Sequence, residues 1–408
     1  MTSQTQTGTV DARAAVPGPV LNNTEAPRQP WMKIPLIRPD LPALDDLKEE
    51  FAEILGNGKI TNFGKYSTRF EDCASEYLGV PAVAISSGTM GLLFTLCALG
   101  LERGQKVILP SFTFMATAQA VLFAGGVPVF AEVGDDLNLS VADLEELLNR
   151  HPDTGAVIAV HMYGLPARVA EIEAAVGRAS RKAGRRIPVV YDAAHAFGAS
   201  IGNRRVGGFG DAEVFSLSVT KVLVAVEGGL VASGRPELIE RIRRMRNYGI
   251  ESNYNAQFAG MNGKMSEFHA LVGLHNLRRL DGLMAARQVR ARLYRQRVEA
   301  ASGFRLVAWP ENAVHTFKDF TVRVPPAWGP DERDRTIAWM ADHGVETRAY
   351  FSPPVHEQGH FRGFADRPLP QTEALSRRVI TLPFYASMTT GEMDYVAERL
   401  RQAEKEIQ

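Results

Sequence analysis

The sequence has few cysteines, no excess charge of either sign and no long apolar run. Its 408 residues include two cysteines, Cys73 and Cys97, which cannot build a disulfide framework and suggest reduced thiols in the cytoplasm. Lysine plus arginine and aspartate plus glutamate number 46 each, so no net charge favours nucleic acid or an anionic membrane. No apolar run reaches the roughly 20 residues of a membrane-spanning helix. We therefore expect a cytoplasmic protein that binds neither nucleic acid nor membrane.

A dinucleotide-binding fingerprint is also missing, because no Gly-x-Gly-x-x-Gly pattern follows a predicted strand. The glycine-rich stretch 207–210 resembles that pattern superficially. It precedes an apolar strand and opens no helix, so it predicts a tight connection.

The pattern of apolar and amphipathic segments along the chain predicts an α/β protein. Residues 1–30 are rich in Thr, Gln, Pro and Ala and predict a disordered tail. In the predicted large domain, residues 31–275, short apolar runs alternate with amphipathic stretches. This alternation predicts a mostly parallel sheet with helices on both faces. In the predicted small C-terminal α/β domain, residues 276–408, β runs at 317–324 and 345–348 flank a helix at 331–343.

Two residues follow buried-strand patterns in a way that suggests chemistry. Asp192 closes the apolar run 187–191, and Lys221 follows a second run, 212–217, through a polar turn. A carboxylate at the end of such a strand lies where open α/β sheets bind ligands. A lysine amine among apolar neighbours loses solvation and becomes nucleophilic. The pair suggests pyridoxal phosphate, with the lysine forming a Schiff base and the aspartate keeping the pyridine nitrogen protonated.

The order of several motifs gives a family resemblance. The chain carries Asp192-Ala193-Ala194-His195, Gly210-Asp211-Ala212, Thr220-Lys221 and Glu227-Gly228-Gly229. In this it resembles the DegT/DnrJ/StrS family of pyridoxal phosphate-dependent sugar aminotransferases, over roughly residues 33 to 405. The resemblance implies the aspartate aminotransferase type of fold (fold type I) and a homodimer with shared active sites. Two positions depart from the family pattern: Ser218, where members often have His, and Val226, where they often have Gly.

The resemblance also implies a cofactor site. Lys221 and Asp192 would be catalytic, and no metal is expected. Gly88, Thr89 and Ser216 would bind the cofactor phosphate, although Ser87-Gly88-Thr89 also fits simple helix capping. Phe114 would stack on the pyridine ring, and His195 would hydrogen-bond near the ring hydroxyl.

Four further residues are assigned by resemblance to the substrate or to the neighbouring subunit. Tyr163, Tyr350 and His356 would face the substrate, with a turn for Tyr163 and a satisfied surface histidine for His356 as the competing interpretations. Asn262 would contact the phosphate across the dimer interface, or would cap a helix beginning near Lys264.

The reaction implied is a ping-pong transamination. L-glutamate, or L-glutamine, would donate an amino group to a keto sugar linked to a nucleotide. An unlinked keto-cyclitol or keto-sugar, as in aminoglycoside antibiotic assembly, is the nearest alternative. A dehydratase is less favoured because such relatives replace the lysine with His. A non-catalytic regulatory relative is disfavoured by the intact Asp192 and Lys221.

Overall fold

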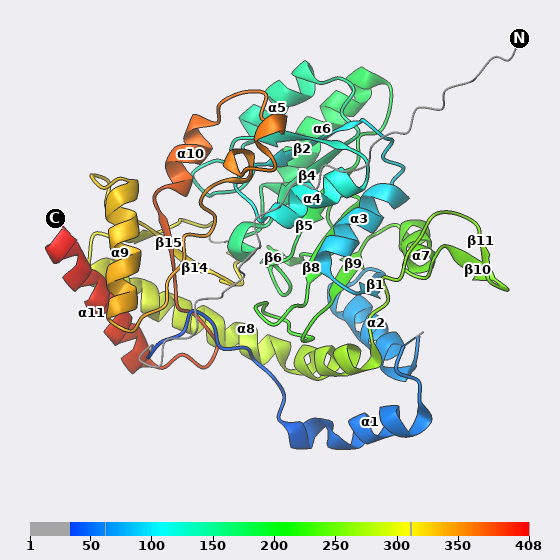
Figure 1. The fold of residues 1–408 in the computed structure, drawn as a ribbon, viewed down its shortest axis with the longest axis horizontal. Helices are drawn as coiled ribbons and strands as arrows, with labels where there is room; N and C mark the ends of the chain where they lie inside the picture. The colour runs from blue at the N-terminus through cyan, green and yellow to red at the C-terminus, as the bar shows by residue number, and fades with distance from the viewer. Residues whose placement is uncertain (1–32, 62, 311, 408) are drawn as a thin grey trace, which may run out of the picture.

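The computed structural model describes residues 33–61, 63–310 and 312–407. The tail predicted at residues 1–30 lies outside this range. Most of the described chain is built around one seven-stranded sheet (Figure 1). Its strand order is β1-β9-β8-β5-β4-β2-β3. The strands are β1 (Ala82–Ile85), β2 (Lys106–Pro110), β3 (Val127–Ala131), β4 (Ala156–Val160), β5 (Val189–Asp192), β8 (Ala212–Ser216) and β9 (Gly229–Ala232).

The sheet is parallel except at β9, which runs antiparallel to both β1 and β8. The register places Asp192 beside Val160 on one side and Val214 on the other. The predicted mostly parallel sheet is therefore confirmed, with one reversed strand that the sequence pattern did not reveal.

Helices cover both faces of this sheet because its strand residues are apolar on both sides. One face packs against α2 (Lys65–Leu78), α5 (Val141–Arg150), α6 (Val169–Ala183) and the first half of α8 (Glu267–Ala301). The other face packs against α3 (Gly88–Ala98), α4 (Met115–Phe123) and α7 (Pro236–Met245). Neighbouring residues of one strand pack on opposite faces of the sheet. Tyr191 belongs to the hydrophobic core on the first face, and Val190 belongs to the core on the other face.

The long helix α8 links this sheet to a second, smaller core. Leu271 and Leu280 of α8 belong to the core of the large sheet, whereas Tyr294 and Val298 belong to the smaller one. That smaller core lies between α8, α9 (Pro330–Asp342), α11 (Thr390–Ile407) and an antiparallel sheet of order β12-β14-β15. Its strands are β12 (Arg305–Leu306), β14 (Phe320–Arg323) and β15 (Val379–Leu382). The predicted boundary at 275/276 falls inside α8, and the division into two domains stays a prediction.

The β run predicted at 345–348 does not form a strand. Val345 and Arg348 make isolated bridges with two different partners, Ile34 and Thr381, so no continuous ladder develops. β14 pairs instead with β12 on one side and, on the other, with β15, which lies much further along the chain.

The remaining elements lie around these two cores. α1 (Leu44–Asn57) packs along α8, and the hairpin of β10 (Ile250–Ser252) and β11 (Asn255–Ala256) projects beyond α7 (Figure 1). β6 (Ser200–Ile201), β7 (Arg204–Arg205) and β13 (Ala313–Val314) form a small antiparallel sheet. Short helical segments are η1 (Met162–Gly164), η2 (Val355–Glu357), η3 (Arg362–Phe364) and α10 (Pro370–Ser376). Within the described part of the chain, no helix combines the length and the apolarity needed to cross a bilayer.

Candidate active site

Asp192 occupies the carboxyl end of β5 and is buried. The hydroxyl of Thr117 donates a hydrogen bond of 2.7 Å to one carboxylate oxygen, and the amide of Ala194 donates one of 3.1 Å to the other. Burial raises the pKa of the Asp192 carboxyl, while these two donors and the charge of Lys221 oppose that rise. A buried carboxylate held in this way is suited to face a cation, such as a protonated ring nitrogen.

Lys221 lies in the loop between β8 and β9, on the same edge of the sheet. Its backbone amide donates to the carbonyl of Ser218 at 2.9 Å, which closes the polar turn expected there. Burial lowers the pKa of the Lys221 amine to about 8, and the neighbouring charge of Lys318 adds to the effect. The amine is therefore easier to deprotonate, and more nucleophilic, than an ordinary lysine.

The N-terminus of α3 opens toward the same place. The hydroxyl oxygen of Ser87 caps the helix by accepting from the amide of Met90 at 3.2 Å. Helix geometry leaves the amides at Gly88 and Thr89 without intrahelical partners. A Cβ on Gly88 would lie 3.1 Å from the Cβ of Ser216, and a Cβ on Gly229 would lie 2.5 Å from the carbonyl carbon of Ser87. Glycine at these two positions thus lets the helix end, β8 and β9 approach closely, and the N-terminus of a helix favours an anion.

These groups line one cavity of about 420 Å³. Eight of the residues predicted from the sequence are among its lining: Gly88, Thr89, Phe114, Asp192, His195, Ser216, Lys221 and Tyr350. Phe114 is half exposed in the lining, and its ring centroid lies 6.1 Å from that of Phe351. The sequence interpretation missed other residues of the lining: Ser87, Leu92, Ala116, Ala194, Ser218, Thr220, Glu227, Lys318 and Phe351.

His195 is buried at the wall of the cavity, where burial and the charges of Lys221 and Lys318 lower its pKa well below the usual value. The imidazole is therefore neutral near pH 7. Its Nδ1 has no hydrogen-bond partner among the described residues. It lies 3.7 Å from Oδ2 of Asp319, a buried oxygen that likewise lacks a partner in this part of the chain.

Tyr163 is not among the residues that line this cavity, but its ring centroid lies 6.4 Å from that of Phe351, which does line it. It is buried within η1, and its hydroxyl donates to the backbone carbonyl of Tyr350. Its contact with the substrate stays a prediction. What the structure shows is that Tyr163 fixes the segment that carries Tyr350 into the cavity.

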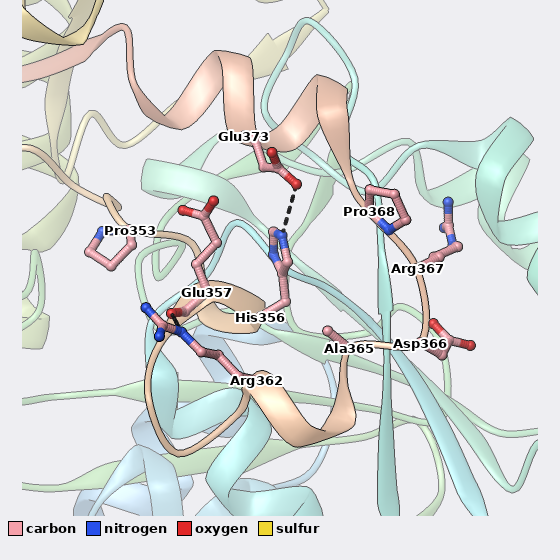
Figure 2. A pocket seen from close by; sticks show the side chains of 9 residues that line it. All are labelled: Pro353, His356, Glu357, Arg362, Ala365, Asp366, Arg367, Pro368 and Glu373. Atoms are coloured by element: carbon pink, nitrogen blue, oxygen red, sulfur yellow. Dashed lines mark hydrogen bonds and ion pairs between the residues drawn. The ribbon is translucent and has the colours of Figure 1, made fainter.

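His356 lines a different pocket (Figure 2). Its Nδ1 lies 2.6 Å from the hydroxyl oxygen of Ser111, its amide donates to the same oxygen at 3.0 Å, and its Nε2 lies 3.3 Å from Glu373. It is buried, so the competing interpretation as a surface histidine is wrong. Substrate contact stays a prediction that this placement does not support.

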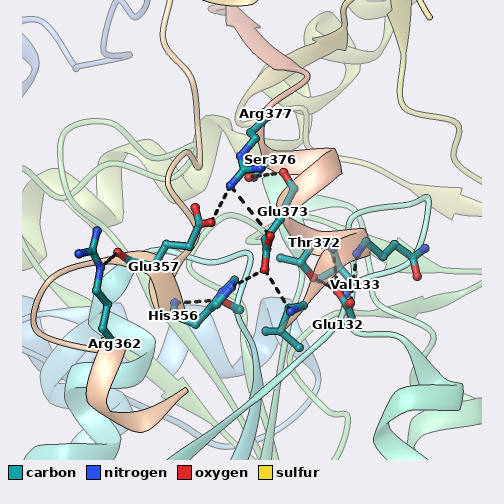
Figure 3. A network of polar contacts seen from close by, with 12 residues as sticks. Glu132, Val133, His356, Glu357, Arg362, Thr372, Glu373, Ser376 and Arg377 are labelled. Atoms are coloured by element: carbon teal, nitrogen blue, oxygen red, sulfur yellow. Dashed lines mark hydrogen bonds and ion pairs between the residues drawn. The ribbon is translucent and has the colours of Figure 1, made fainter. Parts of the chain in front are cut away.

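The surroundings of His356 form a network of polar contacts (Figure 3). Potential ligand atoms of His356, Glu357 and Glu373 lie within 4.8 Å of one another. Glu357 pairs with Arg377 at 2.8 Å, and Glu373 also accepts from the amide of Leu369 at 3.2 Å. Because these groups already have protein partners, hydrogen bonding accounts for the cluster.

Asn262 lines a third pocket with Tyr248 and Lys264, and it forms a β-bridge with Asn247. The suggestion that it caps a helix near Lys264 is wrong. α8 begins at Glu267, and its cap is Ser266, whose hydroxyl oxygen accepts from the amide of His269. The contact of Asn262 with a neighbouring subunit stays a prediction.

The arrangement fits pyridoxal phosphate in its chemistry. The cavity offers a lysine of lowered pKa, a buried carboxylate, a flat aromatic ring and the N-terminus of a helix. When bound at such a site, the cofactor withdraws electrons from the carbon that bears the amino nitrogen. A mostly parallel sheet presenting these groups at its carboxyl edge is the fold type I architecture of pyridoxal phosphate enzymes.

Comparisons with known proteins identify the family. A profile of the DegT/DnrJ/EryC1/StrS aminotransferase family matches residues 44–401, and the chain belongs to this family of pyridoxal phosphate-dependent aminotransferases. A UDP-N-acetyl-3-dehydro-alpha-D-glucosamine 3-aminotransferase of Acidithiobacillus ferrooxidans is 32% identical, with 87% of this chain and 96% of the relative covered. A GDP-perosamine synthase of Caulobacter vibrioides is 31% identical, with 90% and 98% covered. The crystal structure of DesI with its TDP-sugar product has a TM-score of 0.84 at 31% identity, with 92% and 94% covered.

Proposed function

We propose that this aminotransferase moves the amino group of L-glutamate, or L-glutamine, to the keto group of a nucleotide-linked sugar. The observation that carries the proposal is the joint placement of Lys221, Asp192 and the N-terminus of α3 around one cavity. The names of similar proteins support the sugar class: the relatives described above act on, or are solved with, UDP-, GDP- or TDP-linked sugars. The proposal extends to the use of the resulting amino sugar in antibiotic biosynthesis.

Each residue of the cavity has a proposed role. Lys221 holds the cofactor covalently, and its freed amine moves the proton at the donor's Cα as general base and then acid. Asp192 keeps the ring nitrogen protonated, and His195, being neutral, hydrogen-bonds the ring hydroxyl. Gly88, Thr89 and Ser216 bind the phosphate, and Phe114 stacks on the ring. Tyr350 contacts the substrate from the loop above.

Two experiments test this proposal. Borohydride reduction followed by peptide mapping should place the pyridoxyl group on Lys221, and labelling of another lysine would refute its role. A panel of keto-sugar nucleotides and unlinked keto-cyclitols should then be offered to enzyme already converted to its pyridoxamine form. Return of the pyridoxal absorbance with a nucleotide-linked sugar is the expected result. Return with a cyclitol alone would favour the aminoglycoside-type alternative.

The proposal includes a homodimer in which Asn262 of one chain completes the site of the other. Mixing Lys221→Ala and Asn262→Ala proteins under subunit exchange tests it. With shared sites, a mixed dimer has one site carrying both lesions and one carrying neither, so activity should exceed that of either parent. Activity equal to the average of the parents, with exchange confirmed separately, would refute the shared site.

A further inference from the structure

A second lysine, Lys318, lines the cavity that contains Lys221. It is buried, and its amine donates to Oδ1 of Asp319 at 2.7 Å. Lys318 also affects Lys221 directly, since its charge is the second cause of the lowered pKa of that amine. Burying an ammonium costs folding free energy unless the charge has a complete set of protein partners. A protein retains such a charge at a reaction site when it binds a ligand there.

The backbone around Lys318 is held in place from several directions. Arg287, on α8, donates to the carbonyls of Thr316 and Phe317. The hydroxyl of Thr316 donates to the carbonyl of His195 at 2.6 Å, and the amide of Lys318 donates to the carbonyl of Tyr163 at 2.9 Å. The position of Lys318 is therefore fixed relative to both the cavity wall and η1.

The residue before Lys318 is strained. Phe317 has a φ of 50°, in the left-handed region that a bulky side chain rarely occupies. Such strain persists where surrounding contacts impose it, often at functional sites. The strained residue directly precedes the lysine that lines the cavity.

The polar groups beside Lys318 are incompletely satisfied. An ammonium has three donors, and Asp319 accepts one of them. Oδ2 of Asp319 and Nδ1 of His195 are buried and have no partner among the described residues. The remaining donors of the Lys318 ammonium are therefore available to a ligand with acceptor oxygens in the cavity that Lys318 lines.

We propose that Lys318, held by Asp319, binds the α-carboxylate of the amino donor. The inference rests on the proposed function, because it concerns the donor of that same reaction. The α-carboxylate is bonded to the carbon that reacts beside Lys221, so its cation must lie in the same cavity, as Lys318 does. The diphosphate of a nucleotide sugar is separated from the reacting keto carbon by much of the sugar ring. A short, buried lysine site beside Lys221 thus suits the carboxylate better than the diphosphate.

The test compares two donors that differ in this one group. 4-Aminobutyrate has the amine and the distal carboxylate of L-glutamate but lacks the α-carboxylate. In single-turnover reactions of the holoenzyme, Lys318→Gln should lower the second-order rate constant with L-glutamate by about 10- to 100-fold, the value of a charge-assisted hydrogen bond. The rate with 4-aminobutyrate should fall much less, because only the effect of Lys318 on the pKa of Lys221 is then lost.

Binding measured without turnover gives an independent readout. Glutarate, a non-reactive dicarboxylate, should bind the variant holoenzyme at least about tenfold more weakly by calorimetry. Butyrate should bind both proteins equally. Lys318→Arg should retain part of the glutarate affinity, because it keeps the charge. Lys106→Gln serves as a control, since Lys106 forms a lysine–aspartate pair with Asp153 at the other end of β2.

Lys318→Gln leaves Asp319 buried without its partner and can lower folding yield. The double variant Lys318→Gln, Asp319→Asn removes both charges and should show the same loss of donor selectivity. Equal losses for L-glutamate and 4-aminobutyrate would overturn the proposal and show that Lys318 acts only through Lys221. A loss confined to the keto-sugar half-reaction would overturn it in favour of diphosphate binding. If the wild-type enzyme reacts with another amino acid and not with glutamate, the proposed donor fails. The Lys318 comparison is then made with that amino acid and its decarboxylated amine.

Discussion

The hydroxyl of Thr117 donates a hydrogen bond to the carboxylate of Asp192 at 2.7 Å. Its only proton is used in this bond, so the hydroxyl of Thr113, 2.9 Å away, acts as the donor to Thr117. The result is a directed chain from Thr113 through Thr117 to Asp192. Burial raises the pKa of Asp192, and the hydrogen bond from Thr117 opposes this rise by stabilising the ionised carboxylate. A protonated ring nitrogen needs that ionised form as its partner.

Thr117→Val should therefore slow the half-reaction with the amino donor by about 10- to 100-fold, the value of a hydrogen bond to a charged group. Thr113→Val is the matched control. It removes a bond to a neutral hydroxyl, worth only about 1 kcal/mol, and should have a smaller effect. Stopped-flow single-turnover rates measure both. Equal losses in the two variants would mean that packing, and not the bond to Asp192, sets the rate.

The lowered pKa of Lys221 gives a pH prediction for the apoenzyme. Below pH 8 its amine is mostly protonated and unreactive, whereas above pH 8 it is mostly neutral. A short pulse of acetic anhydride, followed by mass spectrometry, should label Lys221 with a midpoint near pH 8. The same residue in the urea-unfolded chain should label with a midpoint near the ordinary lysine value of about 10.4. Identical midpoints in the two states would contradict the expected desolvation.

His356 should act on the enzyme through the loop that it anchors. Its bonds to Ser111 and Glu373 join the end of β2 to α10, and the same loop carries Tyr350 and Phe351 into the cavity. His356→Ala should lower the free energy of unfolding by about 1–3 kcal/mol, because it removes two side-chain hydrogen bonds, one of them to the buried hydroxyl of Ser111. Ser111→Ala removes the same bond, so the double variant should cost less than the sum of the two single variants. Unchanged stability with a higher KM for the keto sugar would instead support direct substrate contact.

Val226 gives a prediction in the stabilising direction. It is a β-branched residue with a φ of 64°, at the position where the family often has glycine. A left-handed backbone conformation costs an L-residue about 1–2 kcal/mol, and glycine avoids this cost. Glycine in turn lowers the free energy of unfolding by about 0.5–1 kcal/mol, because its unfolded state has more conformational freedom. Val226→Gly should thus raise the free energy of unfolding by about 0.5–1 kcal/mol in chemical denaturation. Val219→Gly, in the same loop and equally exposed but without positive φ, should lower it.

The sequence was sufficient to predict the residues whose signal is local. Asp192 and Lys221 each follow a short apolar run that is long enough only for a buried strand. The carboxyl ends of such strands meet at one edge of a parallel sheet. The turn at Gly88 and Thr89 was also predictable, because it directly opens a helix.

Lys318 was missed because nothing near it in the chain signals burial. Two adjacent charges within Phe317-Lys318-Asp319-Phe320 suggest a solvent-facing edge. Their burial depends on Arg287 and Tyr163, which are distant in sequence. His356 shows the reverse case, since an exposed or substrate-facing histidine and a structural one look identical without Ser111 and Glu373 beside them. The reversed strand β9 was hidden for a similar reason, because strand direction leaves no mark in an apolar run.

Helix α8 has a mechanical consequence. At 1.5 Å per residue, its 35 residues form one continuous rod of about 50 Å that is embedded in both hydrophobic cores. Moving one core away from the other would require α8 to bend or its backbone hydrogen bonds to break near the middle of the helix. We therefore expect the two cores to keep nearly the same position relative to each other during turnover. The donor and the sugar must then enter the cavity without a large movement of one core relative to the other.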